Sequence, residues 1–171
     1  MIKDKHPYSK LQFIWLFVLR IVIGWYFLYE GIAKVVSSNW TSYGYLMDSG
    51  GVFAPLFKSL AQNPDLMRIV DFLNIYGLMI VGVLLIFGLF EKMAYIGAIA
   101  LLALYYLSHP ASLNAVYALP PEGSYLWINK NIVMMCSIIV LMVFPTANYL
   151  GLDRLFLLYR NKNEVDGNEV R

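Results

Sequence analysis

Six polar residues in this apolar chain carry side chains that could do chemistry in or beside a membrane. Charged groups inside hydrocarbon are costly, and such residues mark functional sites by default. Cations grouped at one mouth, beside an amide that orients a ligand, could bind an anion or a quinone head group. We take as candidate binding residues Arg20, Glu30, Lys34, His109, Asn129 and Lys130. No residue is assigned as catalytic, and no metal ligand is expected.

Arg20 lies about ten residues into the first apolar segment, which is about 15 Å along a helix. Snorkelling to water is difficult from that depth, so we expect Arg20 to face the bundle interior. Two interpretations remain open. Arg20 forms a buried ion pair that fixes helix packing, with Asp71 or Asp153 as partner, or its charge serves a bound ligand.

Glu30 and Lys34 are four residues apart in the same segment, with the acid first, which is the favoured order for a helical ion pair. An exposed pair of this kind contributes only a few tenths of a kcal/mol. Gly24 and Gly31 indicate instead that parts of this helix pack against protein rather than lipid. Both interpretations stay open.

Several more polar residues follow at the same predicted membrane boundary. Taken singly, Trp40 is typical of an interface anchor, His109 of a helix end, and Lys130 of a helix start. The imidazole of His109 also titrates in the range that permits proton transfer. Taken together, Lys34, His109 and Lys130 predict a cationic mouth, where Asn129 would orient a ligand through a hydrogen bond.

The composition places these residues in a membrane protein. Of the 171 residues, 60% are hydrophobic and 14% are charged, whereas soluble domains have about 45–50% and about 25%. The net charge of +2 gives no basic face for nucleic acid. A single cysteine excludes an internal disulfide. The chain has no HExxH, P-loop, GxGxxG or GxSxG motif.

Four apolar segments are long enough to be membrane helices, which need about 20 residues. The sequence therefore predicts an all-α integral membrane protein, a bundle of four transmembrane helices over residues 11–36, 69–90, 92–108 and 129–150. They form one domain, 1–155, before a polar cytoplasmic tail, 156–171. We expect amphipathic segments in the outer loops, PLFKSLAQ (55–62) and PDLMRIVDFL (64–73), and at the C-terminus, GLDRLFLLYR (151–160).

The distribution of basic residues predicts the orientation. With four helices both termini lie on one side, and that side carries more lysine and arginine near helix ends than the other. The positive-inside rule therefore places the termini in the cytoplasm and the two longer loops outside.

Four pieces of sequence, in this order and spacing, resemble the DoxX/DoxD family of small four-helix membrane proteins. They are LRIVIGWYFLYEGIAK (19–34), NIYGLMIVGVLLIFGLFEKMAYIGA (74–98), WINKN (127–131) and GLDRL (151–155). The resemblance implies a multi-pass protein of the bacterial inner membrane. It also implies one chemistry, because the family includes the membrane subunit of thiosulfate:quinone oxidoreductase.

Three functions are weighed on these grounds. The first is a redox-linked subunit that binds quinone, as substrate or as non-covalent ligand, and passes electrons to it from a thiosulfate-like donor. The second is a non-enzymatic interaction or assembly factor for another complex, which the aromatic outer loops would suit. The third is a small solute carrier. Each contacts the lipid bilayer, and the first two predict a protein partner or a second copy of the chain.

Overall fold

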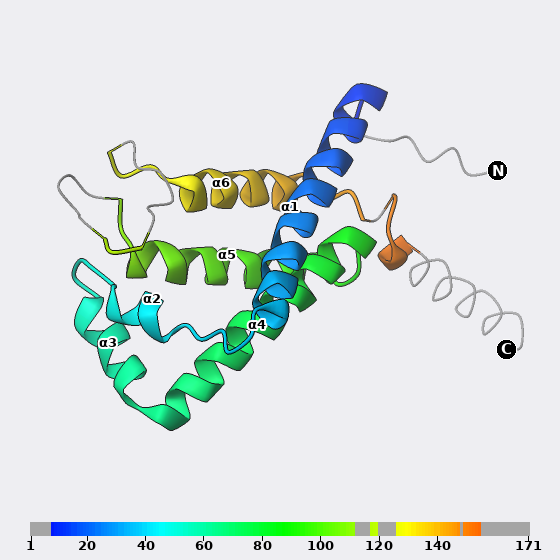
Figure 1. Ribbon diagram of the computed structural model, residues 1–171. Helices are drawn as coiled ribbons and strands as arrows, with labels where there is room; N and C mark the ends of the chain where they lie inside the picture. The colour runs from blue at the N-terminus through cyan, green and yellow to red at the C-terminus, as the bar shows by residue number, and fades with distance from the viewer. Residues whose placement is uncertain (1–7, 112–116, 120–125, 148, 155–171) are drawn as a thin grey trace, which may run out of the picture.

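The computed structural model describes residues 8–111, 117–119, 126–147 and 149–154, and within them every regular element is a helix (Figure 1). The helices are α1 (Lys10–Val36), α2 (Tyr43–Met47), α3 (Ala54–Gln62), α4 (Pro64–Phe87), α5 (Glu91–Ser108) and α6 (Lys130–Val143). The predicted all-α class is confirmed for the described residues. The C-terminal amphipathic segment from residue 155 onward and the tail 156–171 lie outside them.

Two of these helices are long and apolar enough to cross a membrane. The 27 residues of α1 and the 24 of α4 extend about 40 and 36 Å, against a hydrocarbon core of about 30 Å. Ser9 begins α1 through a capping box, in which its hydroxyl accepts from the backbone N–H of Gln12 and the Gln12 side chain accepts from the Ser9 N–H. The first predicted span, 11–36, is confirmed as such a helix.

The second predicted span, 69–90, has wrong boundaries, because α4 runs from Pro64 to Phe87. The Asn63 side chain accepts from the N–H groups of Asp65 and Leu66, and Pro64 occupies the first turn, where its missing N–H costs nothing. Residues 64–73 are therefore the start of α4, not a separate amphipathic helix. The helix ends at Gly88, whose φ of 61° is the left-handed conformation that glycine adopts without strain.

The fourth predicted span, 129–150, is also wrong at its C-terminal end. Helix α6 stops at Val143 after 14 residues, or about 21 Å. Pro145 explains the stop, since proline disfavours the helical conformation in the residue before it, here Phe144. Helix α5, in contrast, agrees with its predicted range of 92–108 to within one residue.

The helices pack as two contacting layers, α1 with α4 and α5 with α6, joined by contacts of α4 with α5 and of α1 with α6. Figure 1 shows α5 and α6 side by side, with α2 and α3 beside the beginning of α4. The common core is made of apolar side chains from all four long helices, among them Phe27, Leu78, Leu85, Leu102 and Ile138. We call the end with the 37–63 connection the loop end, and the end with the 88–90 turn the turn end.

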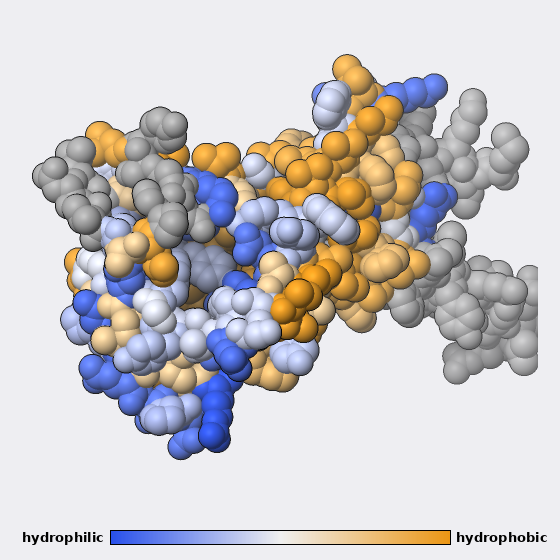
Figure 2. Space-filling model, viewed as in Figure 1, coloured by the Kyte–Doolittle hydropathy of each residue, from blue (hydrophilic) through white to orange (hydrophobic). Residues whose placement is uncertain are grey.

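Large apolar side chains cover the outside of the bundle. On α1 alone the exposed ones include Leu11, Trp15, Val22, Trp25 and Tyr29. Figure 2 shows apolar residues gathered over α1 and polar residues over the corner formed by α2, α3 and the start of α4. This is the surface expected of helices that face lipid. The segment 55–62 lies within α3, and its location at the membrane interface stays a prediction.

Candidate functional site

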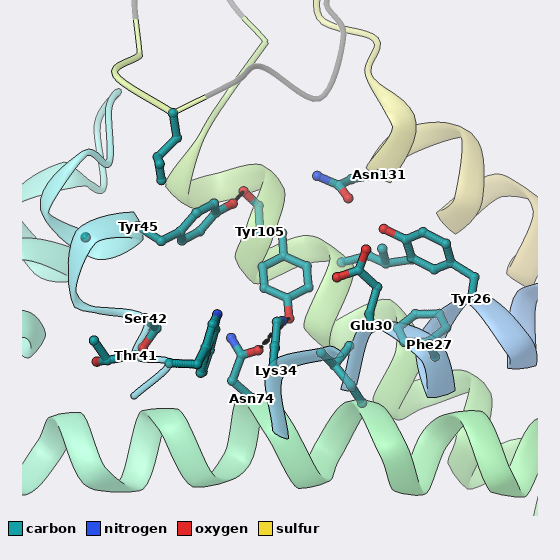
Figure 3. Close-up of a pocket in the computed structure, with 15 residues that line it drawn as sticks. Tyr26, Phe27, Glu30, Lys34, Thr41, Ser42, Tyr45, Asn74, Tyr105 and Asn131 are labelled. Carbon is teal, nitrogen blue, oxygen red and sulfur yellow. Dashed lines mark hydrogen bonds between the residues drawn. The ribbon is translucent and has the colours of Figure 1, made fainter. Parts of the chain in front are cut away.

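A cavity of about 360 Å³ opens at the loop end of the bundle (Figure 3). It is formed where α1, α2, α4, α5 and α6 approach one another, and its wall contains both aromatic rings and polar groups. The lining residues are Tyr26, Phe27, Glu30, Lys34, Trp40, Thr41, Ser42, Gly44, Tyr45, Asn74, Leu78, Leu102, Tyr105, Leu119 and Asn131. Two of the predicted site residues, Glu30 and Lys34, are among them.

Lys34 lies in the last turn of α1 and reaches across to two other helices. Its Nζ donates to Asn74 Oδ1 at 2.6 Å on α4 and approaches the Tyr105 hydroxyl on α5 at 3.4 Å. The Tyr105 hydroxyl also donates to Asn74 Oδ1, at 3.0 Å. The ammonium further lies 5.0 Å from the centre of the Trp40 ring, within the range of a cation–π interaction. The lysine charge is thus fixed in a cage of one amide and two aromatic rings.

Glu30 lines the same cavity one helical turn before Lys34. It is half-buried, and it forms neither a hydrogen bond nor a salt bridge with any residue that the structure describes. Asn131, from the first turn of α6, is 3% exposed, and its side-chain amide has no hydrogen bond within the described part of the chain. Figure 3 shows Glu30, Asn131 and Tyr26 on one side of the cavity, with Lys34 and Tyr105 beside them.

The remaining loop-end residues lie around this cavity without lining it. His109 stacks on the Tyr45 ring at 4.0 Å, and Lys130 Nζ lies 4.9 Å from the centre of the Tyr26 ring, so each contacts a lining residue. Asn129 caps α6, accepting from the Ile132 N–H at 3.2 Å. The structure therefore brings five of the six predicted residues to one end of the bundle.

The sixth, Arg20, lies at the turn end, about 21 Å along α1 from Lys34. It is 1% exposed, and its Nη1 lies 3.6 Å from Glu91 Oε1 and donates to Thr146 Oγ1 at 2.9 Å. Its Nη2 donates to the Leu150 carbonyl at 2.7 Å. Arg20 thus joins α1 to the start of α5 and the chain after α6.

The partners expected for Arg20 were wrong. The Asp71 carboxylate accepts from the backbone N–H and the hydroxyl of Ser42, and Asp153 accepts from the N–H groups of Phe90 and Glu91. The actual partner, Glu91, was not among the predicted site residues. Its burial depends on the turn geometry, which the sequence pattern alone does not show.

Asp48 links two segments at the loop end, the 37–63 connection and the segment that contains Ala118 and Leu119. Its carboxylate oxygens accept from the N–H groups of Ala118 and Leu119 at 2.9 and 3.0 Å, and His109 Nε2 lies 3.6 Å away. The N–H groups of Leu119 and then Ala118, followed by His109, hold the pKa of Asp48 below its ordinary value. Because Leu119 lines the cavity, this carboxylate fixes part of the cavity wall.

Replacing Asp48 with asparagine is expected to destabilise the protein in a pH-dependent way. A carboxyl group whose pKa is lowered in the folded state stabilises fully above its unfolded pKa, about 3.9. This contribution is lost as the pH falls through the lowered pKa of the folded state. Thermal unfolding of wild type and Asp48→Asn between pH 5 and pH 3 should show a difference that shrinks on acidification. An unchanged difference at pH 3 would contradict this assignment.

Sequence reasoning missed Asn74 and Asn131, which supply the amide groups of the cavity. A polar amide within an apolar segment was a usable signal for Asn74, since it needs a partner inside the bundle. Tyr105 was not among the predicted site residues, because tyrosines in apolar helices are more often belt or core residues. The sequence pattern does not show which of Asn129 and Asn131 faces inward. The residue at which α6 begins determines that Asn129 caps the helix and that Asn131 is buried.

The described residues contain no group of three histidine, cysteine or acidic side chains that could hold a metal ion. Comparison with family models gives a match to DoxX over residues 15–110, which is more than half of the chain. Neither the curated proteins nor the solved structures include a significant match. The family match begins within α1 and ends just after α5, so it includes Lys34, Asn74 and Tyr105 from the cavity.

Proposed function

The chain belongs to the DoxX family of membrane proteins, and on this premise we propose that its loop-end cavity binds the head group of a membrane quinone. The observation that carries the proposal is the cavity itself, in which a fixed lysine, an acid and two amides lie among aromatic rings. The cavity volume of about 360 Å³ falls at the small end of the range for ligand sites, which suits a single ring.

The lining groups match the chemistry of a quinone. A quinone ring is flat and stacks on aromatic side chains, which Tyr26, Trp40 and Tyr45 supply. Its two carbonyl oxygens accept hydrogen bonds, and Lys34 and the Asn131 amide are donors within the cavity. The Lys34 ammonium also favours the negative charge that develops on a ring oxygen during reduction.

In the proposed reaction two thiosulfate-like anions are oxidised and join through a new S–S bond, and the two electrons they release, with two protons, convert quinone to quinol. We propose that the chain acts as the quinone-binding subunit in a bacterial inner membrane, with α1, α4, α5 and α6 as its transmembrane bundle. Cytoplasmic termini would then place the cavity near the outer surface. A protein partner or a second copy of the chain completes the proposed system.

Replacing Lys34 with methionine is expected to weaken quinone binding about 10- to 100-fold. The change removes a charge-assisted hydrogen bond, worth about 1.5–3 kcal/mol, and keeps a chain of similar length. The measurement is saturable quenching of tryptophan fluorescence by ubiquinone-1 in the purified protein in nanodiscs. The matched control is Lys92→Met, which removes the same charge from an exposed position at the turn end.

Two outcomes would overturn the binding proposal. One is no saturable binding of ubiquinone-1 or menadione by wild type, and the other is equal binding by Lys34→Met and wild type. The electron-transfer part has its own assay, thiosulfate-dependent quinone reduction with candidate partner subunits added. Absence of reduction there, with binding intact, would reject thiosulfate as the donor and leave the cavity as a quinone site.

A further inference from the structure

Hydrogen-bonding groups in the cavity divide into two sets. Lys34, Asn74 and Tyr105 are bonded to one another, with the lysine charge held among them. Glu30, one turn earlier on α1, lines the cavity as a carboxylate without a hydrogen-bond donor from any described residue. An ionised carboxylate only accepts hydrogen bonds. A ligand that completes this site must therefore bring a donor to Glu30.

The two redox forms of a quinone differ in this property. The oxidised ring carries two carbonyl oxygens, which accept hydrogen bonds and donate none. The reduced ring carries two hydroxyl groups, each of which donates and accepts. A carbonyl oxygen beside Glu30 would leave the half-buried carboxylate without a partner, which is costly, whereas a hydroxyl would form a charge-assisted hydrogen bond.

The other polar groups of the cavity accommodate both forms. The Lys34 ammonium can donate to a carbonyl oxygen or to a hydroxyl oxygen. The Asn131 amide carries both a donor and an acceptor, and the Tyr26 hydroxyl does as well. Glu30 is the lining residue whose hydrogen-bonding capacity separates a quinone from a quinol.

We propose that Glu30 makes this cavity selective for the reduced, quinol form of its ligand. The inference rests on the proposed quinone-binding function and adds a specificity-determining residue to it. A site that binds quinol more tightly than quinone raises the reduction potential of the bound ring. Each tenfold preference raises this two-electron potential by about 30 mV. Glu30 would therefore favour reduction of quinone where it is bound.

The test compares ubiquinone-1 and ubiquinol-1 binding under anaerobic conditions, in wild type, Glu30→Gln and Asp65→Asn. The glutamine keeps the shape of Glu30 and offers both a donor and an acceptor. The control, Asp65→Asn, makes the same chemical change at an exposed residue in the first turn of α4. We expect wild type and Asp65→Asn to bind quinol about tenfold or more tightly than quinone, and Glu30→Gln to bind both within about threefold.

The outcomes separate this inference from the function on which it rests. Binding of neither ligand by wild type would reject the quinone site itself. Equal binding of both ligands by wild type, or a preference for quinol that survives in Glu30→Gln, would reject the role of Glu30 and leave the quinone site standing. Glu30→Asp retains the carboxylate and covers the case in which Glu30→Gln does not fold. It should keep a quinol preference, and its loss there would also count against the inference.

Discussion

Replacing Arg20 with methionine should lower the free energy of unfolding by about 3–5 kcal/mol, the usual cost of leaving one member of a buried ion pair without its partner. Arg20 and Glu91 are 1% and 4% exposed, so neither charge can be solvated without opening the bundle. Methionine fills a similar volume and removes the charge, so the expected loss reflects the uncompensated carboxylate more than a void. Denaturant unfolding of the purified protein in detergent micelles measures this change.

The groups around Glu91 define the control variants. Its carboxylate accepts from the Tyr95 hydroxyl at 2.5 Å and from the N–H groups of Thr146 and Ala147 at 3.3 and 3.1 Å. These neutral donors remain after Arg20 is replaced. The double variant Arg20→Met/Glu91→Gln removes both charges and should recover at least half of the lost stability.

A second control changes the residue beside Glu91. Lys92 is exposed at the same turn, and Lys92→Met should change the stability by about 0.5 kcal/mol or less. If Arg20→Met lost less than about 1 kcal/mol, or if the double variant were less stable than the single one, the ion pair would not be the element that holds this end together.

This pair also shows where sequence reasoning reached its limit. The depth of Arg20 within an apolar segment was sufficient to predict that it faces protein. Its partner was not predictable, because Glu91 becomes buried only when the 88–90 turn places the start of α5 against the chain after α6. That turn combines left-handed Gly88 and left-handed Phe90, and a phenylalanine gives no signal of that conformation in the sequence.

The sequence predicted only part of the cavity, because contacts between helices also determine its geometry. Helical spacing put Glu30 and Lys34 on one face of α1, and the positions of helix ends brought His109 and Lys130 to the same end. The spacing also suggested that Glu30 and Lys34 pair with each other. Instead the Lys34 ammonium is bonded to Asn74, since α4 crosses α1 closely at that level. This hydrogen bond is a contact between two helices, and the residue pattern within one helix does not predict such a contact.

Helix boundaries depended on single residues near the ends. The apolar run alone predicted the second span from residue 69, although Asn63 and Pro64 together form a start signal five residues earlier. Apolar residues likewise continue past Val143, while Pro145 ends α6 there. In both places proline or a capping side chain indicates the helix boundary better than hydropathy does.

The close approach of α1 and α4 leads to the second large prediction, that Gly82→Ala destabilises the protein by about 1–3 kcal/mol. A Cβ atom at Gly82 would lie 2.5 Å from the backbone nitrogen of Leu28 and 2.7 Å from its Cα. Backbone atoms cannot rotate away, so α1 and α4 would have to separate. The gain of up to about 1 kcal/mol in helix propensity from glycine to alanine opposes this cost without cancelling it.

Gly77 on the same helix is the matched control. A Cβ there would meet only the Leu101 side chain, at 3.9 Å, which is an ordinary contact. Gly77→Ala should therefore stabilise the protein by about 0.5–1 kcal/mol through helix propensity. Unfolding of both variants in detergent micelles tests the contrast, and equal effects in the two would show that the α1–α4 distance is not limiting.

The same pair of variants connects the packing to the cavity. Lys34 is on α1 and its acceptor Asn74 is on α4, so their 2.6 Å hydrogen bond requires these helices to stay at their present separation. Gly82→Ala should therefore weaken ubiquinone-1 binding as well as stability, although Gly82 lines no part of the cavity. Gly77→Ala should leave binding within about twofold of wild type. Weakened binding in Gly77→Ala together with unchanged binding in Gly82→Ala would mean that the α1–α4 separation does not set the geometry of the lysine cage.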